Sequence, residues 1–349
     1  MTFARQFAAV LLAFALSGAA QQTQPPPAKR PAPAPSPQDD PQYRIRTRAE
    51  LVVVPITVKD AKGEMVLGIR QSEFRVLEDD VEQEISVFST DPFPLSAVVL
   101  LDNGLAPKPA QQLEISAPAI SAGFAEGDEV AVTLFEAFPQ PLVEFTRDND
   151  KLYDHLKRVQ VSTTYPGMGS GPMTAGPKIN QISPEPKVPS RPETSRVSRG
   201  IKHIDDAIYS AGLLLRDRGR DRRKIIFIVS DGANSPNNEK SFDDTLKLLL
   251  SADISVYAVG VDLALINRGV NPLSRYARLT GGDIFYAATR ADMENTFSRV
   301  TEQARNQYTL AYAPRGTDRN KEFHSVEVRV RRAALSVRAR DGYYTAVQP

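Results

Sequence analysis

Two aspartates stand out because each directly follows an unbroken apolar run. Asp102 ends residues 96–102 (SAVVLLD), and Asp231 follows residues 224–230 (KIIFIVS). Runs of Val, Ile and Leu of this length, each followed by a helical pattern, are typical of parallel strands buried on both faces. Ligands of open α/β sheets bind at the carboxyl ends of the strands, so the two carboxylates are predicted to share a site there.

The region that must position these aspartates alternates between strand and helix patterns. Strands are predicted at residues 96–101, 129–135, 142–145, 224–230, 254–261 and 283–286. Helices are predicted over residues 152–159, 201–215, 242–249 and 293–304, with another at 113–124 that Pro118 should kink or end. This order predicts a Rossmann-like α/β fold, with a doubly wound, mostly parallel sheet and right-handed crossovers.

Strand patterns flank the α/β region on both sides. Before it, an alternating apolar strand and a turn at residues 60–63 lead into short strands that continue to residue 88. The alternating residues are Val52, Val54, Ile56 and Val58. After it, strands are predicted at 307–314, 324–331, 335–340 and 342–344. Neither set has enough strands to be stable alone, so we predict one discontinuous antiparallel β domain into which the α/β domain is inserted.

The sequence divides into five predicted parts. Residues 1–20 are expected to be a signal peptide, with a positive start, an apolar centre and small residues before the cleavage point. Residues 21–43 contain eight prolines and should form an extended linker. An N-terminal β module (44–92), an α/β domain (93–305) and C-terminal strands (306–349) complete the chain. The protein is therefore expected to be exported to the periplasm, the cell surface or the medium.

Residues 163–199 interrupt the strand and helix rhythm. Pro, Gly, Ser and Thr account for 20 of these 37 residues. Such a composition does not recover the entropy lost on ordering, so we predict a flexible insertion beside the aspartate site.

Charge and cysteine content exclude several classes of partner and chemistry. The 349 residues carry 43 basic and 42 acidic side chains, which gives no electrostatic reason to expect nucleic acid or an anionic membrane as a partner. The absence of cysteine excludes disulfides, thiol catalysis and cysteine metal sites. The N-terminal apolar run is too short to span a bilayer, so no membrane span is expected.

The order of elements and the two aspartates resemble a von Willebrand factor type A (VWA) domain. In that family the first strand ends in D-x-S-x-S, a later loop supplies a threonine and the fourth strand ends in an aspartate; together they hold a divalent cation that binds a partner's carboxylate. Further positions resemble the VWFA-related proteins found in Acidobacteria. They are Phe74, Val76, Glu78, Asp79, Gln83, Ile85, Phe88, Asp206, Ala207, Ser230, Gly232, Thr280, Gly281, Gly282, Gln307, Tyr308, Tyr312, Pro314, Arg340, Gly342 and Tyr343.

This chain departs from the family at three of the metal-ligand positions. Gly104 and Ala106 stand where the first motif has serines, and Lys202 stands near the threonine position. The loss of three hydroxyls leaves Asp102 and Asp231 as the remaining candidate metal ligands, and a lysine could itself neutralise them. The resemblance therefore implies a degenerate adhesion site, either metal-free or with weakly bound Mg²⁺ or Ca²⁺.

Asp102 and Asp231 also allow interpretations other than an adhesion site. An aspartic protease would need Ser or Thr after each aspartate and antiparallel lobes, and a phosphotransferase would need a second acid where Gly104 stands. Alternatively, each aspartate has a structural role and accepts hydrogen bonds from backbone N–H groups of its own turn. His155, His203 and His324 are scattered without partners at metal-ligand spacing, and the basic run at 216–224 is expected to be a solvated loop.

The expected function is an exported, non-catalytic protein-binding module that is not an enzyme. No nucleophile, base and orienting group can be assembled from the sequence, which disfavours a hydrolase. Lys202 is expected to attract an acidic group of a protein partner, together with the insertion. The alternative is a structural envelope component in which the aspartate edge is vestigial.

Overall fold

Eight consecutive buried residues form strand β5 (Leu95–Asp102), the centre of a six-stranded sheet. The computed structural model describes residues 51–161, 201–316, 318 and 320–345. The predicted signal peptide, Pro-rich linker and 163–199 insertion therefore lie outside the described residues.

The sheet order is β10-β9-β8-β5-β6-β7, and all neighbours are parallel except β6 and β7. Counted along the chain, this is the doubly wound order 3-2-1-4-5-6. The strands are β6 (Glu129–Phe135), β7 (Pro139–Thr146), β8 (Arg223–Ser230), β9 (Ile254–Gly260) and β10 (Asp283–Tyr286). The Rossmann-like, VWA-like α/β fold predicted from the sequence is confirmed.

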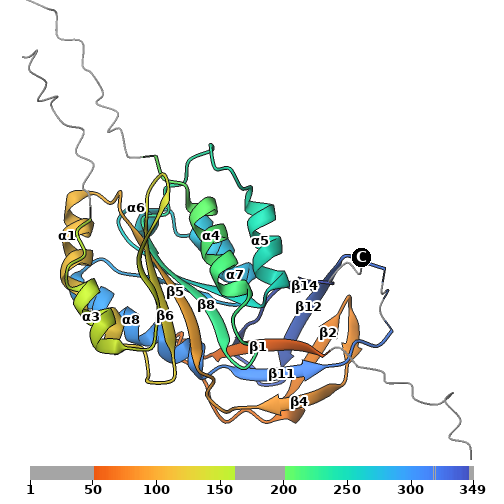
Figure 1. Ribbon diagram of the computed structural model, residues 1–349. Helices are drawn as coiled ribbons and strands as arrows, with labels where there is room; N and C mark the ends of the chain where they lie inside the picture. The colour runs from red at the N-terminus through yellow and green to blue at the C-terminus, as the bar shows by residue number, and fades with distance from the viewer. Residues whose placement is uncertain (1–50, 162–200, 317, 319, 346–349) are drawn as a thin grey trace, which may run out of the picture. The chain divides into compact units, whose positions relative to one another are not determined.

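Helices cover both faces of this sheet (Figure 1). One face carries α1 (Pro107–Ser116), α2 (Ala119–Ala122), α3 (Asn149–Leu156) and α8 (Arg290–Arg305), and the other carries α4 (Ile204–Arg216), α5 (Phe242–Ser251) and α7 (Pro272–Leu279). A short helix, α6 (Leu263–Ile266), follows β9. Because both faces are buried, the central parts of β5 (residues 97–101) and β8 (residues 225–229) are apolar without polar alternation.

Some predicted helix boundaries were wrong. The helix predicted from residue 201 begins at Ile204, and Ile201 is 60% exposed. The helix predicted over 113–124 begins earlier, at Pro107, and is interrupted at Pro118 as predicted, so that α1 ends at Ser116 and α2 begins at Ala119. Helices α6 and α7 were not predicted.

The flanking strands pair as predicted, which confirms the discontinuous β domain. The sheets are β13-β1-β11-β4 and β14-β12-β2-β3, so each combines strands from both ends of the described chain. Their bounds are β1 (Val52–Lys59), β2 (Phe74–Glu78), β3 (Val81–Gln83), β4 (Ile85–Ser89), β11 (Tyr308–Tyr312), β12 (Phe323–Val330), β13 (Ser336–Arg338) and β14 (Gly342–Tyr344), with a 3₁₀ turn at Gln71–Glu73. One apolar cluster, which includes Val54, Val76 and Tyr308, packs between the two sheets.

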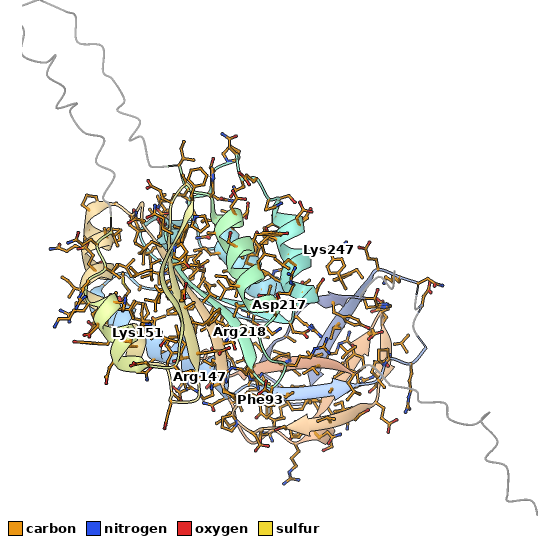
Figure 2. All side chains as sticks on the ribbon, in the orientation of Figure 1. Phe93, Arg147, Lys151, Asp217, Arg218 and Lys247 are labelled. Carbon is orange, nitrogen blue, oxygen red and sulfur yellow. The ribbon has the colours of Figure 1, made fainter. Side chains whose placement is uncertain are left out.

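Charged side chains join the β domain to the α/β domain, and part of the basic run takes this role. The Arg223 guanidinium donates to the Gln307 carbonyl (2.6 Å) and Thr309 Oγ1 (3.0 Å), and burial lowers the pKa of Arg223 to about 10. Lys247 of α5 lies over the ring of Tyr344 (Figure 2). The prediction that residues 216–224 form a solvated loop was wrong for Arg223, because the preceding turn directs it into the domain junction.

Candidate functional site

The two aspartates lie where the strand order of the sheet reverses. Strand β5 ends at Asp102, and its parallel neighbour β8 ends at Ser230, directly before Asp231. Helices that follow these strands leave toward opposite faces, which opens a space at the carboxyl edge of such sheets. The predicted shared location of Asp102 and Asp231 is confirmed.

Lys202 fills the space between these carboxylates. Its Nζ lies 2.9 Å from Asp102 Oδ2 and 2.9 Å from Asp231 Oδ1. The side chains of Lys202, Asp102 and Asp231 are only 1%, 0% and 2% exposed. We call these three residues the carboxyl-edge triad. The ammonium directly compensates two charges that would otherwise be buried without a cation.

The backbone around Lys202 is fixed before α4 begins. The Ser235 N–H donates to the Lys202 carbonyl (2.7 Å), and the His203 N–H donates to the Glu136 carbonyl (2.9 Å). These bonds tie residues 202 and 203 to the loops that follow β8 and β6. The lysine therefore enters the sheet edge from a segment held on both sides.

Gly104 makes room for the lysine side chain. A Cβ added at Gly104 would lie 2.9 Å from Lys202 Cε, closer than real Cβ contacts. The serine that the VWA pattern places at this position would meet Lys202 in the same way. The two departures from the pattern are therefore linked, because the long lysine side chain needs the glycine.

Donors of the chain other than Lys202 also bind the two carboxylates. Asp102 accepts the Gly104 N–H at Oδ1 (2.9 Å) and the Ser230 hydroxyl at Oδ2 (2.7 Å). Asp231 Oδ1 accepts the Ala233 N–H (2.9 Å). Each aspartate thus caps its own turn, as the structural interpretation of the sequence predicted.

Burial raises the pKa of Asp102, and the neighbouring Asp231 charge acts in the same direction. Lys202 and the Ser230 hydroxyl oppose this rise by stabilising the ionised form. Among these groups, the Lys202 charge is the largest influence that favours the ionised form of Asp102.

These residues do not fit a divalent cation of the adhesion-site type. Mg²⁺ requires a near-octahedral set of oxygens, whereas Lys202 Nζ lies between the two carboxylates, and Gly104 and Ala106 have no side-chain oxygen. Ala106 serves as the N-cap residue of α1 and makes no side-chain bond there. The geometry gives no support to the weak Mg²⁺ or Ca²⁺ that the resemblance allowed.

The prediction that Lys202 contacts an acidic group of a partner was wrong for this geometry. The ammonium is buried and already bonded to two carboxylates, so an external acid cannot reach it without opening the triad. Sequence reasoning also gave Ser230 no role in the site. Its hydroxyl could have been considered from its place beside Asp231, at the end of a buried strand.

A second charged cluster lies at the opposite edge of the sheet, where β5 and β6 begin. Glu129 accepts two bonds from Arg218 (2.8 and 2.5 Å) and one from the Ser96 hydroxyl (2.7 Å). Arg147, labelled with Arg218 in Figure 2, adds a longer ion pair at 3.6 Å. Hydrogen bonding to Arg218 lowers the pKa of Glu129 to about 2, and burial opposes this shift. The partly exposed Arg218 and the exposed Arg147 suit a structural ion-pair network.

The prediction that the histidines have no partner at metal-ligand spacing was wrong for His324. Its Nδ1 lies 2.7 Å from Asp79 Oδ2 and 3.6 Å from Glu78 Oε1, in the β domain. The pairing of β2 with β12 brings together residues separated by 245 positions. Histidine spacing along the chain carries no signal for such a contact.

The described residues thus define a VWA-like α/β module carried on an antiparallel β domain. No family model and no curated protein matches the sequence. Within the described residues, no helix has both the length and the apolar content needed to cross a bilayer.

Several solved structures are similar at low identity. BatB from Bacteroides thetaiotaomicron is 13% identical, with 60% of this chain and 98% of that chain covered and a TM-score of 0.41. A von Willebrand factor type A protein from Catenulispora acidiphila is 8% identical, with 78% and 74% covered and a TM-score of 0.43. Proximal thread matrix protein 1 from the mussel byssus, solved with a zinc-occupied MIDAS motif, is 14% identical, with 65% and 49% covered and a TM-score of 0.43. The fold assignment rests on the strand order and register of this chain.

Proposed function

We propose that this protein is an exported, non-catalytic protein-binding module in which Lys202 replaces the divalent cation of an adhesion site. The observation that carries the proposal is the buried contact of Lys202 Nζ with both Asp102 and Asp231, at 2.9 Å each. Such a site is degenerate, because an ammonium enclosed by its own chain leaves no open coordination position for a partner's carboxylate. The closer resemblance to the VWFA-related proteins of Acidobacteria stays a prediction.

The lack of catalysis is inferred from the state of the two acids. A general base or nucleophile must reach a substrate, and a nucleophile needs a base beside it. Asp102 and Asp231 are buried and bonded to fixed donors, and the third member of the triad is a cation that stabilises their charge. This arrangement favours a rigid support over a reaction centre.

Partner binding is therefore assigned to exposed side chains around the triad. Four apolar residues with high exposure belong to segments that connect the strands and helices at the carboxyl edge, and we call them the apolar rim: Phe138 (69%), Ile201 (60%), Ile266 (77%) and Val270 (86%). Single exposed apolar residues are ordinary in proteins. Their occurrence in three connecting segments of one sheet edge supports a protein-binding surface there.

The test is partner capture by the full chain, immobilised and exposed to an envelope fraction of its source. We expect capture to persist in a chelator and to fall at least about tenfold in a Phe138→Ser, Val270→Ser double variant, a loss of about 1.4 kcal/mol. Leu67→Ser is the matched control, because Leu67 is 62% exposed in the β domain.

Three results would overturn the proposal. Capture that a chelator abolishes would show a metal-mediated contact. Capture that survives the double variant but is lost in Leu67→Ser would assign binding to the β domain, as in a structural envelope component with a vestigial edge. Hydrolysis of any substrate by the wild-type chain that is lost in Asp102→Asn would support the hydrolase alternative instead.

A further inference from the structure

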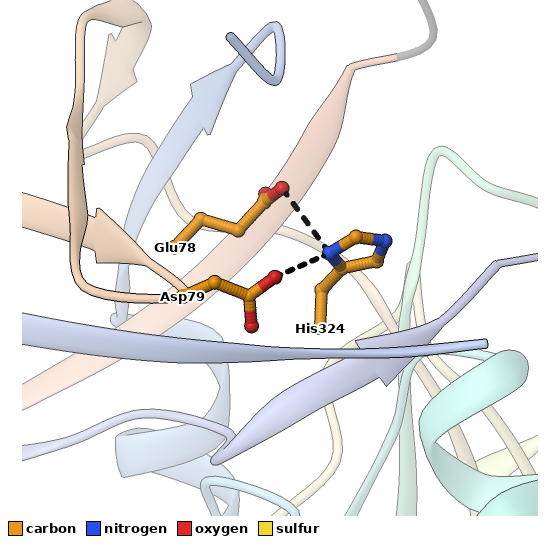
Figure 3. Close-up of side chains that lie close together, drawn as sticks. All are labelled: Glu78, Asp79 and His324. Carbon is orange, nitrogen blue, oxygen red and sulfur yellow. Dashed lines mark hydrogen bonds and ion pairs between the residues drawn. The ribbon is translucent and has the colours of Figure 1, made fainter. Parts of the chain in front are cut away.

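We propose that Glu78, Asp79 and His324 form a binding site for a divalent transition-metal ion of the Zn²⁺ class in the β domain. One ligand atom from each residue lies within 4.8 Å of the other two. The imidazole and two carboxylates are a donor set that suits Zn²⁺. Figure 3 shows the two acidic side chains directed toward the histidine ring.

A buried oxygen without a partner points to a missing ligand. Glu78 is 0% exposed, and its Oε1 has no hydrogen-bond partner although it lies 3.6 Å from His324 Nδ1. A buried carboxylate is expensive unless it is paired or bound to a metal. The Tyr312 hydroxyl, which interacts with Glu78, also makes no hydrogen bond of normal length and angle. The interior beside His324 is therefore polar but incompletely satisfied.

The other carboxylate oxygens are held away from the histidine by donors. Tyr343 Oη donates to Glu78 Oε2 (3.1 Å). Lys321 Nζ (2.6 Å) and the Ser325 N–H (3.0 Å) donate to Asp79 Oδ1. Each acid thus keeps one oxygen in the surrounding hydrogen bonds and turns the other toward His324 Nδ1. Such outer bonds orient metal ligands in proteins.

The backbone at Asp79 explains how two consecutive residues serve one site. Adjacent side chains of a strand point to opposite faces. Asp79 has φ +46° and Asp80 has φ +67°, in the left-handed region that L-residues seldom adopt. This turn ends the alternation after Glu78 and brings both acids to the same histidine.

The distances are close to those of a tetrahedral site. Ligand atoms at Zn²⁺ bond lengths of about 2.0–2.1 Å are separated by about 3.3 Å. The 3.6 Å separation of Glu78 Oε1 and His324 Nδ1 is near this value, the 2.7 Å separation of His324 Nδ1 and Asp79 Oδ2 must widen by less than about 1 Å, and the two acids offer oxygens within 4.8 Å of each other. On binding, the ion replaces the Nδ1 proton, and the ring carries its proton on Nε2. The fourth position remains for water.

Access to the ion is from the side of Asp79. The Asp79 side chain is 17% exposed, and that of Lys321 beside it is 47% exposed. The Lys321 ammonium repels an approaching cation.

The experiment measures Zn²⁺ binding to the untagged full chain by calorimetry, with Mg²⁺ as the comparison ion. We expect one Zn²⁺ per chain, no comparable Mg²⁺ binding and visible Co²⁺ absorption bands typical of four- or five-coordinate geometry. Glu78→Gln and His324→Gln should weaken binding by at least about tenfold, whereas His155→Gln, which alters a partly exposed histidine of α3, should leave it unchanged.

The proposal is wrong if the wild-type chain binds no Zn²⁺ at millimolar concentration, or if binding survives in both Glu78→Gln and His324→Gln. The wild-type Co²⁺ spectrum needs no variant, so it keeps the test decisive if His324→Gln fails to fold. An octahedral Co²⁺ spectrum identical to that of the free ion would also overturn the site.

Discussion

The carboxyl-edge triad and the Glu78 cluster place buried carboxylates in similar surroundings but compensate them differently. At the sheet edge the chain supplies its own cation, and Lys202 Nζ bonds to both acids. In the β domain, Glu78 has a tyrosine donor on one oxygen and no hydrogen bond on the other. The Lys202 ammonium therefore occupies the first site, whereas the second site keeps a carboxylate oxygen that can bind a ligand.

The largest effect is expected from Lys202→Met, which removes the compensating charge and keeps the side-chain length. Leaving two buried carboxylates without a cation should reduce the free energy of unfolding by about 3–5 kcal/mol. Urea unfolding measures this change, with the exposed Lys108→Met as control. Millimolar Mg²⁺ should not restore stability, because Gly104 and Ala106 offer no oxygen; a restoration would show that the edge still holds a metal.

A smaller effect is expected from Gly104→Ala. The new Cβ would lie 2.9 Å from Lys202 Cε, and such overpacking reduces stability by about 1–3 kcal/mol. Gly269→Ala is the control, since nothing lies within 4 Å of a Cβ there. In a Lys202→Ala background the penalty should shrink. Equal penalties in the two backgrounds would contradict the link between Gly104 and Lys202.

The charge of Glu129 is compensated in a third way, by arginines near the surface. The contribution of these ion pairs to stability should depend on pH. Its folded-state pKa is lowered from 4.5 to about 2. Its contribution to stability is therefore present above pH 4.5 and is lost as the pH falls toward 2. The urea midpoint of the wild type should decrease over this window more than that of Glu129→Gln; parallel curves would argue against the ion pair.

The smallest effect is expected from Glu78→Gln without metal. Its carboxylate has no cation of the kind that Lys202 provides, so neutralising it should change the free energy of unfolding by less than about 1 kcal/mol. Asp102→Asn provides the contrast, because it disrupts a compensated triad. Thermal unfolding of both variants in the presence of a chelator tests this prediction. A loss of stability in Glu78→Gln as large as that in Asp102→Asn would remove the distinction between the two sites.

The sequence alone determined most of the strands, the doubly wound class of the sheet and the edge at which Asp102 and Asp231 lie. Unbroken apolar runs predict strands covered on both faces, and chain order with right-handed crossovers places their carboxyl ends together. The β domain followed from two short sets of alternating residues that could not be stable apart. Helix starts were less predictable, as at Ile204, because exposed ends carry little periodic signal.

The sequence suggested that Lys202 could neutralise the two aspartates, but only the tertiary structure decided how its side chain reaches them. Lys202 is 100 residues from Asp102, and its entry depends on the space at Gly104 and on backbone bonds to two other loops. His324 meets Asp79 through strand pairing across 245 residues. Buried charges take their partners from whatever the packed chain places beside them, and local patterns do not record such proximity.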